Sequence, residues 1–309
     1  MKRRYLVIIL LLAVVALLCL YVWHRHNLKE SRVSAKEAHT EVTNANVSGC
    51  PYTYVSWNME NFGMPHGKHG KPSDVIKHMA HVACKNADII AAQEINAAGG
   101  GGAQAVALLA ENCSEMGVAW DYIVSDSSLP HNDEAERYAY LWRTDKFDIN
   151  RKEAHLVEEL RDPISREPYE VTFTPKKGGE PVSVFTMHAV PTEKNPITEI
   201  RALENSKEIK GTKRAIFSGD FNLAKRATDP SFEALGFHGN IDEPTSLKRD
   251  VVGDQYRVKQ YDNIYTKNLG VCTSGVIDFV GTDFSPVTKE SLHEARKLSD
   301  HLPVFATFK

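Results

Sequence analysis

The stretch "SGDFNL" (218–223) follows the apolar run "AIF" (215–217) and leaves a carboxylate and an amide at its end. The aromatic and β-branched residues of the run predict a buried strand. Asp220 and Asn222 are one residue apart, and alternate side chains of an extended segment point to the same side. The pair therefore fits either ordinary turn chemistry or half of a site for an anion or a metal ion.

Polar side chains also mark the ends of five other predicted strands. Each residue alone fits a turn or a hydrogen-bonded core histidine better than a site. Together they indicate a cleft, because strand ends converge in layered folds. The strands and their polar residues are 52–58 with Asn58, 88–94 with Glu94, 182–188 with His188, 261–266 with Asp262, and 303–308 with Asp300 and His301.

The residue types in this set favour metal-assisted hydrolysis of a phosphate ester. Carboxylates and amides are oxygen ligands suited to Mg²⁺ or Mn²⁺, with Ca²⁺ as an alternative structural ion. Two histidines can donate and accept protons near neutral pH. No Cys/His pair has zinc spacing and no Gly-x-Ser-x-Gly elbow occurs. "GGGG" (99–102) lacks the Lys-Ser/Thr of a phosphate-binding loop, so we expect a flexible connection there.

The region 50–309 reads as one domain of mixed α/β (α+β) class. Many short strand patterns mix with a few helical ones, and no linker-like segment divides them. Further strands are predicted at 120–125, 137–143, 169–174 and 214–220, and helices at 71–86, 103–113 and 197–210.

The N-terminus predicts a membrane anchor. Residues 1–4 are a basic tail, expected in the cytoplasm, and 5–23 form an uncharged apolar run long enough to cross a bilayer. No small-x-small cleavage site follows it, so an uncleaved signal anchor is favoured over a cleaved signal peptide, with secretion after cleavage as the alternative. Residues 24–49 read as a linker, which places the domain 50–309 outside the cytoplasm, in the periplasm if the source is bacterial.

The net charge and the number of cysteines bear on nucleic-acid binding and on disulfide bonds. The formal net charge is −3, so the charge balance gives no indication of nucleic-acid binding. A bound cation can nevertheless supply positive charge locally. Beyond the apolar run lie Cys50, Cys84, Cys113 and Cys272, an even number that permits two disulfides in any of three pairings. Free thiols filling apolar helix faces are the alternative for Cys84 and Cys113.

Eight short motifs resemble, in order and rough spacing, the endonuclease/exonuclease/phosphatase superfamily. Two of them, at 136–143 and 165–171, resemble its deoxyribonuclease I branch, and the resemblance spans about 52–309. The motifs are "WNMENFG" (57–63), "QE" (93–94), "ERYAYLWR" (136–143), "SREPYEV" (165–171), "MHAVP" (187–191), "SGDFN" (218–222), "YDNI" (261–264) and "SDHLPV" (299–304).

The resemblance implies a four-layer αββα sandwich of two packed mixed β-sheets, with the site at one edge of the sheets. It implies that Glu94 is the main metal ligand, with Asn58 beside it and Asp300 completing the metal environment. His188 and His301 resemble the general acid/base pair, and Asp220 resembles the residue that positions the attacking water.

The resemblance also implies which residues orient the two histidines and which contact the phosphate. Glu136 would orient His188 and Asp262 would orient His301. Asn222 and Arg166 resemble the residues that contact the scissile phosphate.

Two positions depart from the nuclease branch. Asn96 and Glu134 stand where that branch has an arginine and a tyrosine that enter the DNA minor groove. Catalysis is therefore better supported than duplex binding. The prediction is a monomeric, membrane-anchored, metal-dependent endonuclease acting on DNA. The alternatives are a phosphoesterase acting on lipid head groups or inositol phosphates, although the loop 126–135 is polar, and a non-catalytic tethered binding module.

Overall fold

A computed structural model describes residues 49–65, 70–97, 101–128 and 135–309. The described residues, which begin at Gly49, form one compact unit. The predicted anchor (5–23), the linker up to residue 48 and Glu134 lie outside the described residues. No helix within the described ranges is long and apolar enough to cross a membrane.

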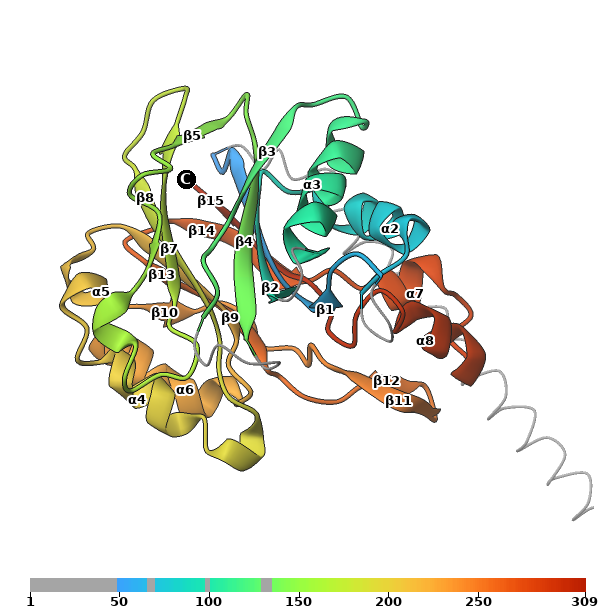
Figure 1. The fold of residues 1–309 in the computed structure, drawn as a ribbon. Helices are drawn as coiled ribbons and strands as arrows, with labels where there is room; N and C mark the ends of the chain where they lie inside the picture. The colour runs from blue at the N-terminus through green and yellow to red at the C-terminus, as the bar shows by residue number, and fades with distance from the viewer. Residues whose placement is uncertain (1–48, 66–69, 98–100, 129–134) are drawn as a thin grey trace, which may run out of the picture. The chain divides into compact units, whose positions relative to one another are not determined.

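Two β-sheets form the centre of the compact unit (Figure 1). The six-stranded sheet is mixed, since β1 pairs with β2 in parallel and with β15 antiparallel. In spatial order its strands are β14 (Val271–Val276), β15 (Val304–Phe308), β1 (Tyr52–Phe62), β2 (Ile89–Asn96), β4 (Glu136–Arg143) and β3 (Trp120–Val124).

The second sheet is also mixed, because β8 and β9 run in parallel while the other pairs are antiparallel. Its strands, in order, are β10 (His238–Gly239), β13 (Asp262–Lys267), β9 (Ala215–Asp220), β8 (Val182–His188), β7 (Tyr169–Pro175) and β5 (Phe147–Ile149), with β6 (His155–Leu156) paired to β7. A separate hairpin consists of β11 (Leu247–Val252) and β12 (Gln255–Arg257) and projects from the lower edge of the molecule in Figure 1.

The inner faces of the two sheets share one apolar core. Tyr54 and Tyr140 of the first sheet and Val184 of the second belong to the same buried cluster. Hydrogen bonds also cross between the sheets; for example, Tyr54 Oη lies 2.7 Å from Ser218 Oγ, and Tyr140 Oη donates to the Val184 carbonyl at 3.0 Å. Burying aromatic rings with their hydroxyls paired avoids the cost of an unsatisfied polar group.

Helices cover the outer faces, which gives the layer order predicted for the sandwich (Figure 1). Ile200 and Phe232 pack with Phe185 and Phe217 in a second buried cluster on the outer face of the second sheet. The helices are α2 (Ser73–Cys84), α3 (Gly101–Ser114), α4 (Ile197–Leu203), α5 (Lys207–Gly211), α6 (Lys225–Ala234), α7 (Phe279–Asp283) and α8 (Lys289–Ala295), with short 3₁₀ turns at Glu158–Leu160 and Thr192–Lys194.

Several predicted boundaries were wrong. The single helix expected at 197–210 is two helices, because the Ser206 side chain caps a new start by accepting from Ile209 N. Gly101 and Gly102 belong to α3 rather than to a loop. There the missing Cβ matters, since a Cβ on Gly102 would lie 2.2 Å from the Asn96 carbonyl oxygen.

The four cysteines beyond the predicted anchor form two disulfides. Cys50 pairs with Cys272, and Cys84 pairs with Cys113. The first bond ties the segment that enters β1 to β14, and the second joins α2 to α3. The alternative of free thiols at Cys84 and Cys113 was therefore wrong.

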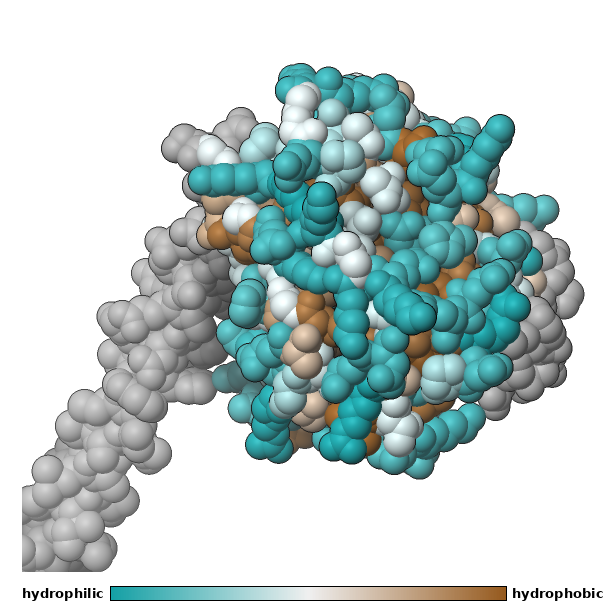
Figure 2. All heavy atoms as spheres, turned by 90° about the vertical axis from the view of Figure 1, so that its left-hand side faces the viewer, coloured by the Kyte–Doolittle hydropathy of each residue, from teal (hydrophilic) through white to brown (hydrophobic). Residues whose placement is uncertain are grey.

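The face shown in Figure 2 is largely hydrophilic, with apolar residues confined to small separate areas. Surfaces of this kind are usual for a domain surrounded by water.

Candidate active site

Strand register brings the polar residues of the second sheet together. β8 and β9 are parallel and pair His188 with Asp220, while β9 and β13 pair Asp220 with Asp262. The three residues therefore lie side by side at one end of three adjacent strands. Gly219 is required here, because its φ is +143° and a Cβ would lie 1.9 Å from the Met187 carbonyl oxygen.

The first sheet contributes Asn58 from β1, Glu94 from β2, and His301 from the segment before β15. Trp57 Nε1 donates to the His301 carbonyl at 2.8 Å, and Ser299 Oγ donates to the Asn58 carbonyl at 2.7 Å. These buried bonds hold the segment that carries His301 against β1, at the same end of the sandwich as His188.

Asp220 is the centre of the cluster. Its Oδ2 lies 3.5 Å from His301 Nε2 and 3.7 Å from His188 Nε2. The same oxygen accepts a hydrogen bond from Asn58 Nδ2 at 3.0 Å, and Oδ1 accepts one from Asn222 N at 2.9 Å. Two imidazoles from different sheets thus face one buried carboxylate.

A second carboxylate contacts each histidine at Nδ1, the ring nitrogen that faces away from Asp220. His301 Nδ1 lies 2.7 Å from Asp262 Oδ2, and His188 Nδ1 lies 2.8 Å from Glu136 Oε2. Thr245 Oγ1 donates to Asp262 Oδ2 at 2.5 Å. Because each Nδ1 is used in this way, Nε2 is the ring nitrogen that faces the centre of the cluster.

These contacts favour the charged forms of the central groups. Burial alone would lower the pKa of His301, but Asp262 and Asp220 more than offset it and raise that pKa well above the usual value. Burial likewise opposes the charge of His188, yet Glu136 raises its pKa overall. Burial raises the pKa of Asp220, while His301 and His188 outweigh it and lower that pKa. The cluster is therefore a network of mutually stabilised charges.

Arg166 lies behind this network rather than facing an open cleft. Its Nη1 donates to Glu136 Oε1 at 2.6 Å, while Nε and Nη2 donate to the carbonyls of His188 and Ala189 at 3.0 and 2.9 Å. The side chain is buried. All three guanidinium nitrogens thus have protein partners, which differs from the phosphate-gripping arrangement expected from the sequence.

Asn222 also differs from its expected geometry. β9 ends at Asp220, and Asn222 adopts a left-handed backbone with φ of 51° instead of continuing the strand. Its Nδ2 donates to the Ala189 carbonyl at 3.0 Å. Asn222 still lies beside Asp220, but a turn brings it there and not strand alternation.

Asn58 links Asp220 to Glu94. Its Nδ2 donates to Glu94 Oε1 at 2.8 Å as well as to Asp220, and its Oδ1 accepts from Glu60 N at 3.0 Å. The amide therefore turns its nitrogen toward the two carboxylates. Coordination of a metal ion by the Asn58 oxygen, as predicted, would require the opposite orientation of this amide.

Acidic groups crowd the side of the cluster near Glu94. Burial and the charges of Asp300 and Glu94 raise the pKa of Glu60, although Lys71 opposes them. Lys71 is itself buried, and its Nζ lies 3.6 Å from Glu60 Oε2. Burial lowers the pKa of Lys71 against the pull of Glu60, Asp300 and Glu94. Arg296 is a second cation here, with Nη2 3.6 Å from Asp300 Oδ2. The three carboxylates still form a donor set that fits a hard divalent cation.

A second group could also hold a metal ion. Asp220, Asp262 and His301 place one donor atom each within 4.8 Å of one another, and all three are buried. However, Asp262 Oδ2 is already engaged by His301 Nδ1 and Thr245 Oγ1. We therefore favour the Glu94 side for a cation and a hydrogen-bonded pair for Asp262 and His301.

Backbone strain is concentrated at this site. Six non-glycine residues among those described have positive φ, and four of them lie in the cluster: Glu60 (43°), Asn61 (51°), Glu94 (59°) and Asn222 (51°). Such conformations are costly for residues with a Cβ and persist where surrounding contacts enforce them. Here Asn61 N donates to Glu94 Oε2 at 2.9 Å, which holds that carboxylate in place.

Three neighbours of the cluster were not predicted from the sequence. Glu60 and Lys71 lie at its acidic side, and Tyr138 Oη accepts from His188 N at 3.1 Å while donating to the Arg166 carbonyl. Glu60 stands within "WNMENFG", so that motif held a signal for it. Lys71 begins a helical pattern after a polar loop and carried none.

Similar solved structures were found by fold, whereas no family model and no curated protein matches the sequence. An endonuclease/exonuclease/phosphatase family protein from Leptotrichia buccalis is 16% identical, covers 84% of this chain and 99% of its own, and superposes with a TM-score of 0.57. A mannosyl-6-phosphatase from Bacteroides thetaiotaomicron is 20% identical, with 84% and 99% covered and a TM-score of 0.57. TDP2 from D. rerio, solved with a single-strand DNA product, is 13% identical, with 84% and 98% covered and a TM-score of 0.56.

At these identities the likeness concerns the fold. It confirms the predicted superfamily resemblance at that level, and the described part of the chain has the fold of endonuclease/exonuclease/phosphatase family proteins.

Proposed function

We propose that this chain is a divalent-metal-dependent phosphodiesterase, and specifically an endonuclease that hydrolyses DNA. The observation that carries the proposal is Asp220 Oδ2 between His188 Nε2 and His301 Nε2, with a carboxylate behind each histidine. Hydrolysis of a phosphodiester requires deprotonation of water and protonation of the leaving oxygen. Two oriented imidazoles and one central carboxylate supply groups for both.

In this scheme the ring nitrogens that face the cluster do the proton transfer. A water oxygen bonds to phosphorus as the ester P–O bond breaks, and the water gives a proton to Nε2 of one imidazole, neutral at that stage. The other imidazole, as imidazolium, gives its Nε2 proton to the leaving oxygen. Asp220 orients and polarises the water. Asp262 and Glu136 hold the rings and stabilise their positive charge, which opposes the charge that builds on the phosphoryl oxygens.

The residues suited to hold a cation are Glu94 and Asp300, with Glu60 beside them. A bound Mg²⁺ or Mn²⁺ would supply a Lewis acid for a phosphoryl oxygen. Asn58 then sets the separation of Glu94 and Asp220, because its Nδ2 donates to both carboxylates, at 2.8 and 3.0 Å. Asn222 remains our candidate for contact with the phosphate.

Arg166 acts, in this proposal, as a positioning residue. It anchors Glu136 and the backbone at His188, so that one guanidinium fixes both members of the pair. A planar fork with several donors suits this task, and lysine could not replace all three bonds.

The hairpin β11–β12 supports a polyanionic substrate. Arg249 of β11 and Lys259, two residues after β12, are exposed, and neither side chain pairs with an acidic group in the described part of the chain. The hairpin starts directly beside the cluster, because Ser246 pairs with His301 and Leu247 N donates to the Asp300 carbonyl at 2.7 Å. Cations so placed can contact phosphates next to the scissile one. TDP2, one of the similar structures, binds a single-strand DNA product.

The second candidate is a phosphoesterase with a smaller substrate, in the class of inositol phosphates or lipid head groups. The mannosyl-6-phosphatase among the similar structures favours it. The polar loop 126–135 and the basic hairpin favour nucleic acid over lipid.

We further propose that the domain, as a monomer, lies outside the cytoplasm and is anchored by residues 5–23. The two disulfides support this location, because such bonds persist in oxidising compartments.

A substrate panel tests the function with the full chain in detergent. We expect it to nick plasmid DNA with Mg²⁺ or Mn²⁺ and to stop when EDTA is added. The panel adds single-stranded DNA, RNA, inositol phosphates and sphingomyelin. Release of phosphate or phosphocholine with intact DNA would replace the endonuclease by the second candidate, and inactivity on every substrate would favour the non-catalytic module.

A further inference from the structure

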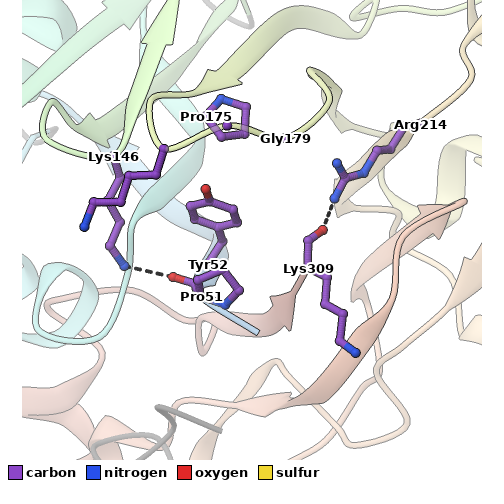
Figure 3. A pocket seen from close by; sticks show the side chains of 9 residues that line it. Pro51, Tyr52, Lys146, Pro175, Gly179, Arg214 and Lys309 are labelled. Carbon is purple, nitrogen blue, oxygen red and sulfur yellow. Dashed lines mark hydrogen bonds between the residues drawn. The ribbon is translucent and has the colours of Figure 1, made fainter. Parts of the chain in front are cut away.

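A basic pocket lies at the end of the sandwich opposite the active site. It has a volume of about 480 Å³ and is lined by Tyr52, Lys146, Lys177, Arg214 and Lys309, together with Pro51 and the turn 175–179. Four of these residues are cationic and no acidic side chain lines the pocket. Figure 3 shows the ring of Tyr52 between Lys146 on one side and Arg214 and Lys309 on the other.

Backbone contacts hold two of the cations in place. Lys146 Nζ donates to the Pro51 carbonyl at 2.9 Å and pairs with Asp88 at 2.8 Å. Arg214 donates to the backbone oxygens of Glu180 and Lys309. Asp88 thus neutralises Lys146, while Arg214 is held by backbone oxygens.

Two lysines at the pocket, Lys177 and Lys309, have no acidic side chain as a partner among the described residues. Both side chains are exposed. Two held cations and two free ammonium groups around one cavity suit an anion with several oxygen acceptors, and phosphate has that chemistry.

The pocket also lies where the chain enters the domain. Pro51 and Tyr52 form its rim and directly follow Cys50, the first cysteine after the predicted linker 24–49. β1 leads from Tyr52 to Asn58, so the active site is about 20 Å away along this strand. β15 likewise runs from His301 toward Lys309, and β9 from Arg214 toward Asp220.

We propose that this pocket binds the phosphate of an anionic phospholipid head group and sets the orientation of the domain on its own membrane. The linker would enter the domain on the membrane side, where Lys177 and Lys309 are attracted to anionic lipid. The active site would then face away from that bilayer, toward substrates in solution. This inference rests on the anchor predicted for residues 5–23 and does not depend on the proposed reaction.

Lysine labelling tests the proposal with the full chain. The chain is placed in nanodiscs of phosphatidylglycerol or of phosphatidylcholine, treated with an amine-reactive reagent, and mapped by mass spectrometry. We expect Lys177 to react at least about threefold more slowly in phosphatidylglycerol, since attraction to anionic lipid buries it. Lys259, which follows the hairpin beside the active site, should react equally in both lipids.

A pair of charge reversals sharpens the test. Lys309→Glu should reduce the protection of Lys177, whereas Lys259→Glu, with the same charge change at the other end, should leave it intact. Thermal unfolding checks that both variants fold. Equal labelling of Lys177 in the two lipids would overturn the proposal. A second outcome would also overturn it. If inorganic phosphate or a single-stranded oligonucleotide protected Lys177 in phosphatidylcholine discs, and labelling did not differ between the two lipids, the ligand would be another anion.

Discussion

His301 Nδ1 lies 2.7 Å from Asp262 Oδ2, and the same histidine turns Nε2 toward Asp220 at 3.5 Å. The imidazole is thus fixed between two buried carboxylates, one that holds it and one that faces the centre of the cluster. This arrangement raises the pKa of His301 and leaves Nε2 as the nitrogen that can reach a substrate.

Replacing His301 should therefore remove proton transfer without unfolding the chain. We expect His301→Ala and His188→Ala each to lower kcat for plasmid nicking by roughly 10²- to 10⁴-fold, the usual contribution of a general acid or base. Lys152→Ala, an exposed lysine elsewhere, serves as the control. Near-normal kcat in both histidine variants, with an unchanged unfolding temperature, would disprove the acid/base assignment.

Replacing Arg166 tests whether this residue positions His188 or binds the substrate phosphate. With its nitrogens committed to Glu136 and two carbonyls, Arg166→Gln should lower kcat about tenfold or more through a misplaced His188 while KM changes little. Burial and Glu136 dominate the pKa of His188, but Arg166 also lowers it. The His188 limb of the pH profile should therefore move to higher pH in the variant. A rise in KM with unchanged kcat would restore the predicted phosphate contact.

The sequence correctly predicted that polar residues at strand ends lie close together. It did not predict the hydrogen-bond partners of individual side chains such as Arg166. His188, Asp220 and Asp262 end or begin strands, and strand pairing alone aligns them. The contacts of Arg166 could not be predicted, because they depend on a loop that folds back onto residues 188 and 189. The hairpin β11–β12 was not among the predicted strands, because it has an irregular register and little apolar alternation.

Binding of a divalent cation should stabilise the chain independently of catalysis. Mg²⁺ would relieve the repulsion among Glu60, Glu94 and Asp300. At a hundredfold excess over Kd, it should add about 2.7 kcal/mol to the free energy of unfolding, or roughly 5 °C in Tm. Differential scanning fluorimetry with and without Mg²⁺ measures this shift. Glu94→Gln should reduce the shift strongly, and Glu290→Gln, at an exposed helix position, should not. Equal shifts in both variants would place the cation elsewhere.

The raised pKa of His301 also predicts how stability depends on pH. Folded His301 keeps its proton above about pH 6.5, where the unfolded residue loses it, so its contribution is complete below that pH and is lost as pH rises through the folded pKa. In EDTA, Tm should fall from pH 6.5 into the alkaline range. His301→Gln should show a shallower fall, and parallel curves for the two proteins would contradict the ion pair with Asp262.

The hairpin β11–β12 provides the test of a polyanionic substrate. If Arg249 and Lys259 each contact a phosphate, Arg249→Glu/Lys259→Glu should weaken binding of a single-stranded oligonucleotide and reduce the slope of log Kd against log salt by about 1.4. Hydrolysis of a small diester such as bis(p-nitrophenyl) phosphate places no phosphate on the hairpin, so it measures the state of the catalytic cluster in the same variant. The matched control is Lys177→Glu/Lys309→Glu, which changes charge equally at the opposite end and should keep the slope. If the hairpin variant lost activity on the small diester but kept its salt slope, the hairpin would support the cluster through its bonds to Asp300 and His301 without contacting the substrate.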